Sequence, residues 1–198
     1  MYEYRKMTPA QRAAVLAERK ARGYPLHEPP HFEEGVNTCM LTGVCFEHKK
    51  ILTSTSRRLE EFSEALICGI KTAVRGKLYA WVVLPNHDHL LAEVDLAVFR
   101  AWIGSLHNGK STQWIREDDC RGRRVWYRFS DRKIRNDRHF YASVNYIHFN
   151  PVRHKCVEKA SDWPWNSLHS YVDDVGPETL AEWWHKYPID DYGKGWDD

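Results

Sequence analysis

Two histidines, His87 and His89, stand two positions apart in an extended run of mostly apolar residues that ends at Val94. Because side chains alternate between the two faces of a strand, both imidazoles leave the same face. Two imidazoles on one face can share one divalent metal ion. Short motifs also arise by chance, so a surface strand with two incidental histidines is the alternative interpretation.

A second pair of polar residues, Tyr146 and Asn150, lies in a segment that precedes Pro151. On a helix these two positions are one turn apart, so a phenol and an amide project from one face. A tyrosine in such a pair could act as a nucleophile. A tyrosine that packs at the boundary of the core is the simpler alternative when the pair is taken alone.

Taken together, these segments resemble a known family. Residues 84–91 (LPNHDHLL) resemble the histidine-hydrophobic-histidine block of the HUH single-tyrosine transposases. Residues 146–154 (YIHFNPVRH), followed by 162–167 (DWPWNS), resemble the catalytic helix and downstream signature of the REP-associated subgroup. Further blocks at 2–6, 43–48 and 125–132 extend the resemblance from the N-terminal arm to about Tyr171.

The resemblance implies an α+β fold of the HUH endonuclease type, with a ferredoxin-like or RRM-like antiparallel sheet and packed helices. It implies that His87, His89 and Asn150 bind Mg²⁺ or Mn²⁺, and that Tyr146 attacks single-stranded or hairpin DNA. The product would be a 5′-phosphotyrosine and a free 3′-hydroxyl, and rejoining would reverse the step. The subgroup implies a repeated extragenic palindrome as the substrate.

The middle position of the histidine block departs from the family, because it holds Asp88 where a hydrophobic residue is usual. The alternation that places the histidines on one face places this carboxylate on the other, which argues against its being a direct metal ligand. A buried acid must reach solvent, pair with a base, or assist the metal from behind its ligands.

The net charge of +2 is the sum over a basic region and an acidic region of the chain. The segment 173–198 carries eight acids against two lysines, whereas residues 120–156 carry ten basic residues against two acids. The basic region predicts a site for a polyanion, and a solvated surface is the alternative. The candidate DNA-binding residues are Lys110, Ser111, Arg124, Arg128, Arg132, Lys133, Arg135 and Arg153. At most one of the adjacent aromatics Trp126 and Tyr127 can point outward, where it could stack on a base, and packing in the core is the commoner alternative.

The order of elements supports one α+β domain. Apolar periodicity and breakers predict strands at 37–46, 78–84, 87–94 and 123–134, and helices at 54–76, from 98 onward, and from 136 or 137 to Pro151. The polar stretch 107–111 could end the second of these helices. Residues 8–11 (TPAQ) predict a capping box before a short basic helix. We therefore expect a basic helix and proline-rich arm at 1–33, the catalytic domain at 34–172 and an acidic tail at 173–198.

A chain of 198 residues with 42% hydrophobic residues is long and apolar enough to build one core. It has no run of apolar residues that could span a bilayer and no apolar segment near its start, so we expect a cytoplasmic protein without a membrane partner. It is expected to act as a monomer or homodimer. Two functional alternatives remain: a catalytically silent nucleic-acid-binding module, and an unrelated metallohydrolase that uses the two histidines.

Overall fold

A computed structural model describes residues 7–21, 35–127, 129–190 and 192 of the chain. The chain divides into two compact units. The larger unit spans Gly35–Tyr192, and the described part of the other is helix α2 (Pro9–Ala21) with the residues just before it. The proline-rich arm, most of it in the segment 22–34, lies outside the described residues.

The predicted capping box is present at the start of α2. The backbone N–H of Thr8 donates to the Gln11 side-chain oxygen at 2.8 Å, and the Gln11 N–H donates to the Thr8 hydroxyl at 3.3 Å. Two N–H groups that no helical carbonyl could reach are thereby satisfied by each other's side chains.

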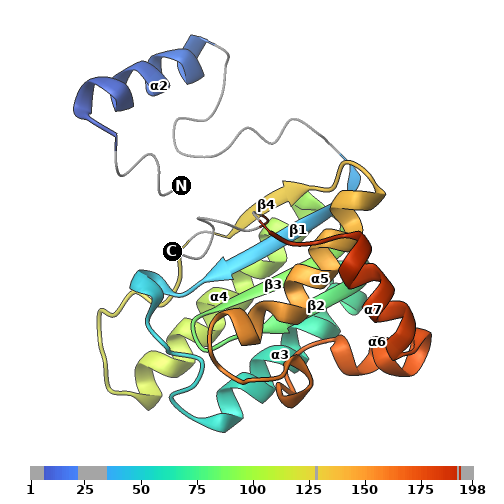
Figure 1. Cartoon of the computed structure of the whole chain (residues 1–198). Coiled ribbons are helices and arrows are strands. Elements are labelled where there is room, and N and C mark those ends of the chain that lie inside the picture. The colour runs from blue at the N-terminus through green and yellow to red at the C-terminus, as the bar shows by residue number, and fades with distance from the viewer. Residues whose placement is uncertain (1–6, 22–34, 128, 191, 193–198) are drawn as a thin grey trace. The chain divides into compact units, whose positions relative to one another are not determined.

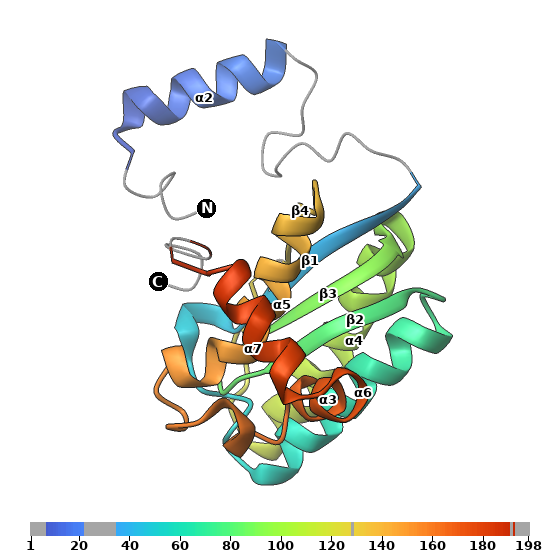
Figure 2. The same cartoon turned by 45° about the vertical axis from the view of Figure 1, so that its right-hand side comes forward.

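The larger unit is built on a four-stranded antiparallel sheet with the order β2-β3-β1-β4. Its strands are β1 (Val36–Val44), β2 (Lys77–Val83), β3 (His87–Asp95) and β4 (Ser130–Lys133). Helices α3 (Ser56–Thr72) and α4 (Leu96–Glu117) cover one face, and α5 (Asp137–Arg153) covers the other (Figure 1; Figure 2). The predicted α+β architecture with an antiparallel sheet is confirmed.

Burial of the central strands follows from this layered arrangement. Strands β1 and β3 lie inside the sheet with helices on both faces, so seven of the nine residues of β3 are buried. A turn at Pro85 and Asn86 joins β2 to β3, as the sequence indicates. A polar side chain on β3 is therefore withdrawn from bulk water whichever face it occupies.

Three local expectations differ from the structure. Helix α4 continues through 107–111, where the hydroxyl of Ser111 donates a hydrogen bond to the carbonyl of His107 at 2.7 Å. Helix α5 passes Pro151 and ends at Arg153, because a proline in the last turn removes only one helical hydrogen bond. The predicted strand 123–134 is an isolated bridge from Trp126 to Cys45 followed by the short β4.

The C-terminal part of the larger unit packs as two helices. These are helix α6 (Leu168–Val175) and helix α7 (Pro177–Lys186). The chain also contains two short 3-10 helices, Phe46–His48 after β1 and Ala160–Asp162 before α6. The Asn145 amide donates to the carbonyls of Trp183 and Tyr187, both at 2.9 Å, which fastens α7 to α5. The compact unit thus extends about twenty residues into the segment expected to be an acidic tail.

The remaining features of the chain are the lengths of its helices and the state of its cysteines. Within the described ranges, no helix combines the length and the apolarity needed to cross a bilayer. All five cysteines are free; Cys39 and Cys45 are buried, Cys156 is half-buried, and Cys68 and Cys120 are exposed.

Candidate active site

The two histidines of β3 face helix α5, as the alternation of side chains requires. His87 is 2% exposed and His89 is fully buried, and their ring centroids are 5.0 Å apart. Strand β1 pairs with β3 so that Val44 lies opposite His87 and Thr42 lies opposite His89. The sheet therefore fixes both imidazoles side by side at one end of β3.

Hydrogen bonds orient each imidazole. The side-chain amide of Asn86 donates to the His48 carbonyl at 3.1 Å, so its oxygen is left to accept the Nδ1–H of His87 at 2.8 Å. With the proton on Nδ1, the neutral ring of His87 carries its lone pair on Nε2. The Nδ1 of His89 lies 2.8 Å from the hydroxyl of Thr42, which holds the second ring.

A metal ion fits the donor atoms that meet here. The Nε2 of His87 lies 3.2 Å from Oδ1 of Asn150, within hydrogen-bonding distance and in a buried position. The Nδ2 of Asn150 finds no hydrogen-bond partner in the described part of the chain. Nε2 of a neutral His87 and Oδ1 of Asn150 could instead both ligate a cation, and His89 would supply a third donor.

The donor set is neutral and small. Among the residues that the structure describes, no group of three or more His, Cys, Asp or Glu side chains is placed to hold a metal ion. A site of two imidazoles and one amide therefore has no carboxylate to compensate the charge of the ion, and it leaves open positions for further oxygen ligands. A phosphate diester supplies both the negative charge and the oxygens.

Tyr146 lies beside these donors on α5. Its side chain is fully buried, and its ring centroid is 5.3 Å from that of His89. Asn136 caps the helix by accepting the N–H of His139 at 2.9 Å, and Asn150 follows Tyr146 by one turn. The structure thus brings His87, His89, Asn150 and Tyr146 together from one strand and one helix.

Three further residues surround this cluster, and of these the sequence analysis had named only Arg153, as a candidate DNA contact. His154, one turn beyond Asn150, packs edge to face on His87 with centroids 4.7 Å apart. Tyr192 packs on Tyr146 at 5.4 Å, and the guanidinium carbon of Arg153 lies 5.5 Å from the centre of the Tyr146 ring. Helical spacing could have found His154, whereas no local pattern points to Tyr192.

Tyr192 is held over Tyr146 by two contacts. Its hydroxyl hydrogen-bonds to the Ser143 hydroxyl, and its carbonyl accepts from Arg153 at 3.2 Å. Burial raises the pKa of the Tyr192 phenol. In this arrangement the Tyr146 side chain is closed off from solvent.

Asp88 lies on the opposite face of β3, next to Gly43, and is 2% exposed. Within the described residues, none of the three arrangements expected for a buried acid is present. The carboxyl group has no basic partner and no access to water, and it does not contact the candidate metal ligands His87 and His89 from behind. Burial raises its pKa to about 8, against a backbone hydrogen bond from Gly43 that lowers it, so the group is mostly protonated at neutral pH.

The candidate DNA-binding residues fall into three groups. Arg132 shares the histidine face of the sheet through its partner Met40, and Arg153 lies over Tyr146. Lys133 and Arg135 are exposed elsewhere on the larger unit, and Arg124 is exposed against the rings of Phe46 and Tyr127. Lys110 and Ser111 lie on α4, across the sheet from the site, and Lys110 contacts Glu61 at 3.5 Å. Arg128 lies outside the described residues.

Comparison with solved structures identifies the class of fold. The chain superimposes on a REP-associated tyrosine transposase solved with a bound REP hairpin, with a TM-score of 0.56 and 24% identity over 75% of this chain and 86% of that one. The fold is therefore that of a REP-associated tyrosine transposase of the HUH type, as the resemblance implies.

Comparison with curated sequences points to the same group. The chain is 33% identical over 105 residues to the REP-associated tyrosine transposase of Escherichia coli (strain K12), covering 48% of this chain and 56% of that protein. It is 31% identical over 121 residues to a putative REP-associated tyrosine transposase of Haemophilus influenzae, covering 54% and 65%. The matched region spans less than two thirds of either relative, and no family model matches the chain. The resemblance to these transposases is confirmed.

Proposed function

We propose that the chain is a metal-dependent DNA endonuclease and strand transferase that uses Tyr146 as its nucleophile on single-stranded or hairpin DNA. The observation that carries the proposal is the convergence of Tyr146 with His87, His89 and Asn150 in one buried cluster. The relatives' names and the REP hairpin in the neighbouring structure support a palindromic DNA substrate of the REP kind.

The proposed chemistry is a transesterification. Tyr146 gives up its phenolic proton, its oxygen forms a bond to phosphorus, and the bond from phosphorus to the 3′-oxygen breaks. The leaving 3′-oxygen takes up a proton, so the step consumes and releases no net proton. The DNA is then held as a 5′-phosphotyrosine, and attack by a 3′-hydroxyl reverses the reaction. A Mg²⁺ or Mn²⁺ ion bound by His87, His89 and Asn150 would neutralise charge on the non-bridging oxygens.

Arginines supply the charge that holds the DNA. Arg132 lies on the face of the sheet that carries the histidines, and Arg153 lies beside the nucleophile. Most of the affinity is expected to come from such phosphate contacts, which release counterions. Binding should therefore weaken steeply with added salt, and a flat salt response would contradict this assignment.

A labelled hairpin oligonucleotide with an unpaired flank, incubated with the full chain and Mn²⁺, tests the nucleophile. A covalent adduct should form with the wild type and disappear in Tyr146→Phe. Tyr141→Phe is a matched control, because Tyr141 lies on the same helix but its ring stacks on Tyr187 at 4.9 Å, away from the histidines. Binding without cleavage in the wild type would favour a silent binding module, and cleavage that survives Tyr146→Phe would favour a metallohydrolase.

The metal ligands can be separated from the DNA-binding surface. His89→Ala should abolish adduct formation and leave retention of the hairpin nearly unchanged, because the arginines remain. Loss of both activities in a folded variant would show that the histidine serves DNA binding itself.

A further inference from the structure

An aromatic and cationic cluster lies beside the candidate active site. The rings of Phe46 and Tyr127 are 4.9 Å apart and tilted by 45°, and His48 lies 6.5 Å from Tyr127. The guanidinium carbon of Arg124 is 4.8 Å from the centre of the Phe46 ring and 5.5 Å from that of Tyr127. We call Phe46, Tyr127 and Arg124 the aromatic platform.

Backbone pairing between two distant segments builds the platform. The N–H of Phe46 donates to the Val125 carbonyl and the N–H of Tyr127 donates to the Val44 carbonyl, both at 2.8 Å. Alternation along this short ladder decides which aromatic points outward. Trp126 points into the core, where it is 7% exposed and stacks on His107 at 4.0 Å, so Tyr127 faces the surface.

The turn that presents Phe46 is strained. Glu47 and His48 both adopt left-handed backbone conformations, with φ of 54° and 53°. Two such residues in succession, neither of them glycine, are sterically disfavoured, because this conformation brings Cβ too close to the following carbonyl oxygen. Strain of this kind persists where the surroundings enforce it and gathers at ligand-binding segments. Here Asn86 enforces it by donating to the His48 carbonyl at 3.1 Å.

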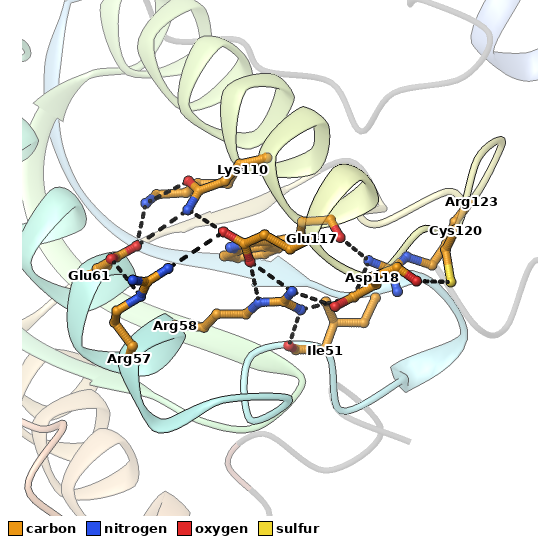
Figure 3. A network of polar contacts seen from close by, with 11 residues as sticks. Ile51, Arg57, Arg58, Glu61, Lys110, Glu117, Asp118, Cys120 and Arg123 are labelled. Carbon is orange, nitrogen blue, oxygen red and sulfur yellow. Dashed lines mark hydrogen bonds and ion pairs between the residues drawn. The ribbon is translucent and has the colours of Figure 1, made fainter.

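Arg124 differs from its neighbours in having its charge available. Arg58 and Arg123 are both paired with Asp118, as Figure 3 shows. Arg124 is exposed and forms no ion pair with any residue that the structure describes. Its Nε donates to the Trp126 carbonyl at 3.1 Å, which holds the guanidinium against the rings. A fixed guanidinium plane beside two rings favours a flat, electron-rich group near a negative charge.

One residue connects the platform to the candidate metal site. The amide nitrogen of Asn86 holds the carbonyl of His48, and its oxygen accepts the Nδ1–H of His87 at 2.8 Å. The platform therefore adjoins the end of the sheet at which a phosphate would meet the metal. A nucleotide next to that phosphate can place its base on the platform.

We propose that Phe46, Tyr127 and Arg124 stack one unpaired base of single-stranded DNA next to the phosphate held at His87 and His89. This rests on the proposed function, because it takes DNA as the substrate. The platform binds any unpaired base rather than one particular base, since every base offers a flat face for stacking. It would place the strand for attack by Tyr146.

Fluorescence of 2-aminopurine tests the stacking directly. The full chain with Tyr146→Phe, which cannot form the adduct, is titrated in the presence of Mg²⁺ into hairpins that carry 2-aminopurine at successive positions of the unpaired flank. One position should be quenched on binding, and the quenching should disappear in Tyr127→Leu and in Phe46→Leu. Tyr127→Phe should preserve it, because the ring and not the hydroxyl provides the stack.

Affinity provides the second measurement. Tyr127→Leu should bind the flanked hairpin about 5–100-fold more weakly, as expected for one base on an aromatic ring, and a blunt hairpin as well as the wild type does. Phe129→Leu is the matched control, because Phe129 is two residues away but packs on Phe99 at 5.2 Å. An abasic nucleotide at the quenched position should make the Tyr127→Leu effect vanish, since the two changes remove the same contact.

The outcomes distinguish this inference from the proposed function. A Tyr146 adduct with no quenched position, in variants whose thermal stability is unchanged, would overturn the platform alone. Quenching and flank-dependent affinity without any adduct would overturn the proposed chemistry and leave the platform. Stronger dependence on Tyr127 for an RNA flank than for a DNA flank would overturn the assignment of DNA as the ligand.

Discussion

A buried arginine, Arg58, joins α3 to the end of α4, and its removal should be costly. The side chain is 2% exposed. Its guanidinium donates to Glu117 through Nε at 3.1 Å and through Nη2 at 2.8 Å, and to Asp118 through Nη1 at 3.0 Å (Figure 3). It also lies 5.6 Å from the centre of the Trp114 ring.

The magnitude follows from the surroundings of this ion pair. Breaking a buried pair by removal of one partner costs about 3–5 kcal/mol. The carboxylates of Glu117 and Asp118 are 30% and 22% exposed, so they recover part of their hydration when the arginine is lost. We therefore expect Arg58→Met to lower the free energy of unfolding by about 3 kcal/mol, or the melting temperature by roughly 6–12 °C.

Urea denaturation at neutral pH measures this loss. Arg57→Met is the matched control, because the neighbouring arginine contacts Glu61 at 3.2 Å and Glu117 at 3.8 Å but is 70% exposed. Exposed ion pairs contribute about 0–1 kcal/mol, so the control should change little. Equal losses in the two variants would refute the argument that burial makes Arg58 important.

The pH dependence supplies an independent check. The hydrogen bond from Arg58 holds the pKa of Asp118 below its usual value, and hydrogen bonds from Gln113 and Arg58 do the same for Glu117. Stabilisation of this kind is fully present above the unfolded-state pKa and is lost as pH falls through the lower folded-state pKa. The difference between wild type and Arg58→Met should be largest at neutral pH and should narrow below about pH 4.

Three further predictions concern other parts of the chain. Burial lowers the pKa of His107 to about 3, so below pH 6.5 the unfolded chain binds a proton that the folded chain excludes, and the free energy of unfolding should fall by about 3 kcal/mol between pH 6.5 and 4. In His107→Phe the free energy of unfolding should fall by about 3 kcal/mol less over the same range. The same pH dependence in urea denaturation of both proteins would contradict this. Asn86→Ala should weaken Mn²⁺ binding about 10–100-fold by calorimetry, because His87 loses the acceptor that fixes its tautomer, and unchanged affinity would exclude that role. Tyr192→Ala should speed adduct formation, because Tyr192 covers Tyr146, and a slower reaction in the folded variant would mean that Tyr192 assists it.

Local chemistry made much of the fold predictable. The reciprocal bonds of Thr8 and Gln11, the cap at Asn136 and the alternation that sends His87 and His89 to one face all depend on residues close in sequence. Short-range steric and hydrogen-bonding rules decide such features, so the chain alone determines them.

The identity of the outward aromatic in the pair Trp126 and Tyr127 was not decided locally. Both suit a strand, and the choice depends on which side of the β1 ladder meets the core around Phe62 and His107. For the same reason the sequence left Lys110 as a candidate for DNA contact, whereas folding places it on α4 beside Glu61.

The sequence by itself determined the types of the candidate metal donors and of the candidate nucleophile, their order and the face of each element that carries them. Only the tertiary structure decided that β3 and α5 meet so that His87 and Asn150, 63 residues apart, lie 3.2 Å from each other. It alone decided that Tyr192 closes over Tyr146 and that Phe46 meets Tyr127. The physical reason is that local rules act within a few residues, whereas the approach of distant segments is set by burial of the whole core.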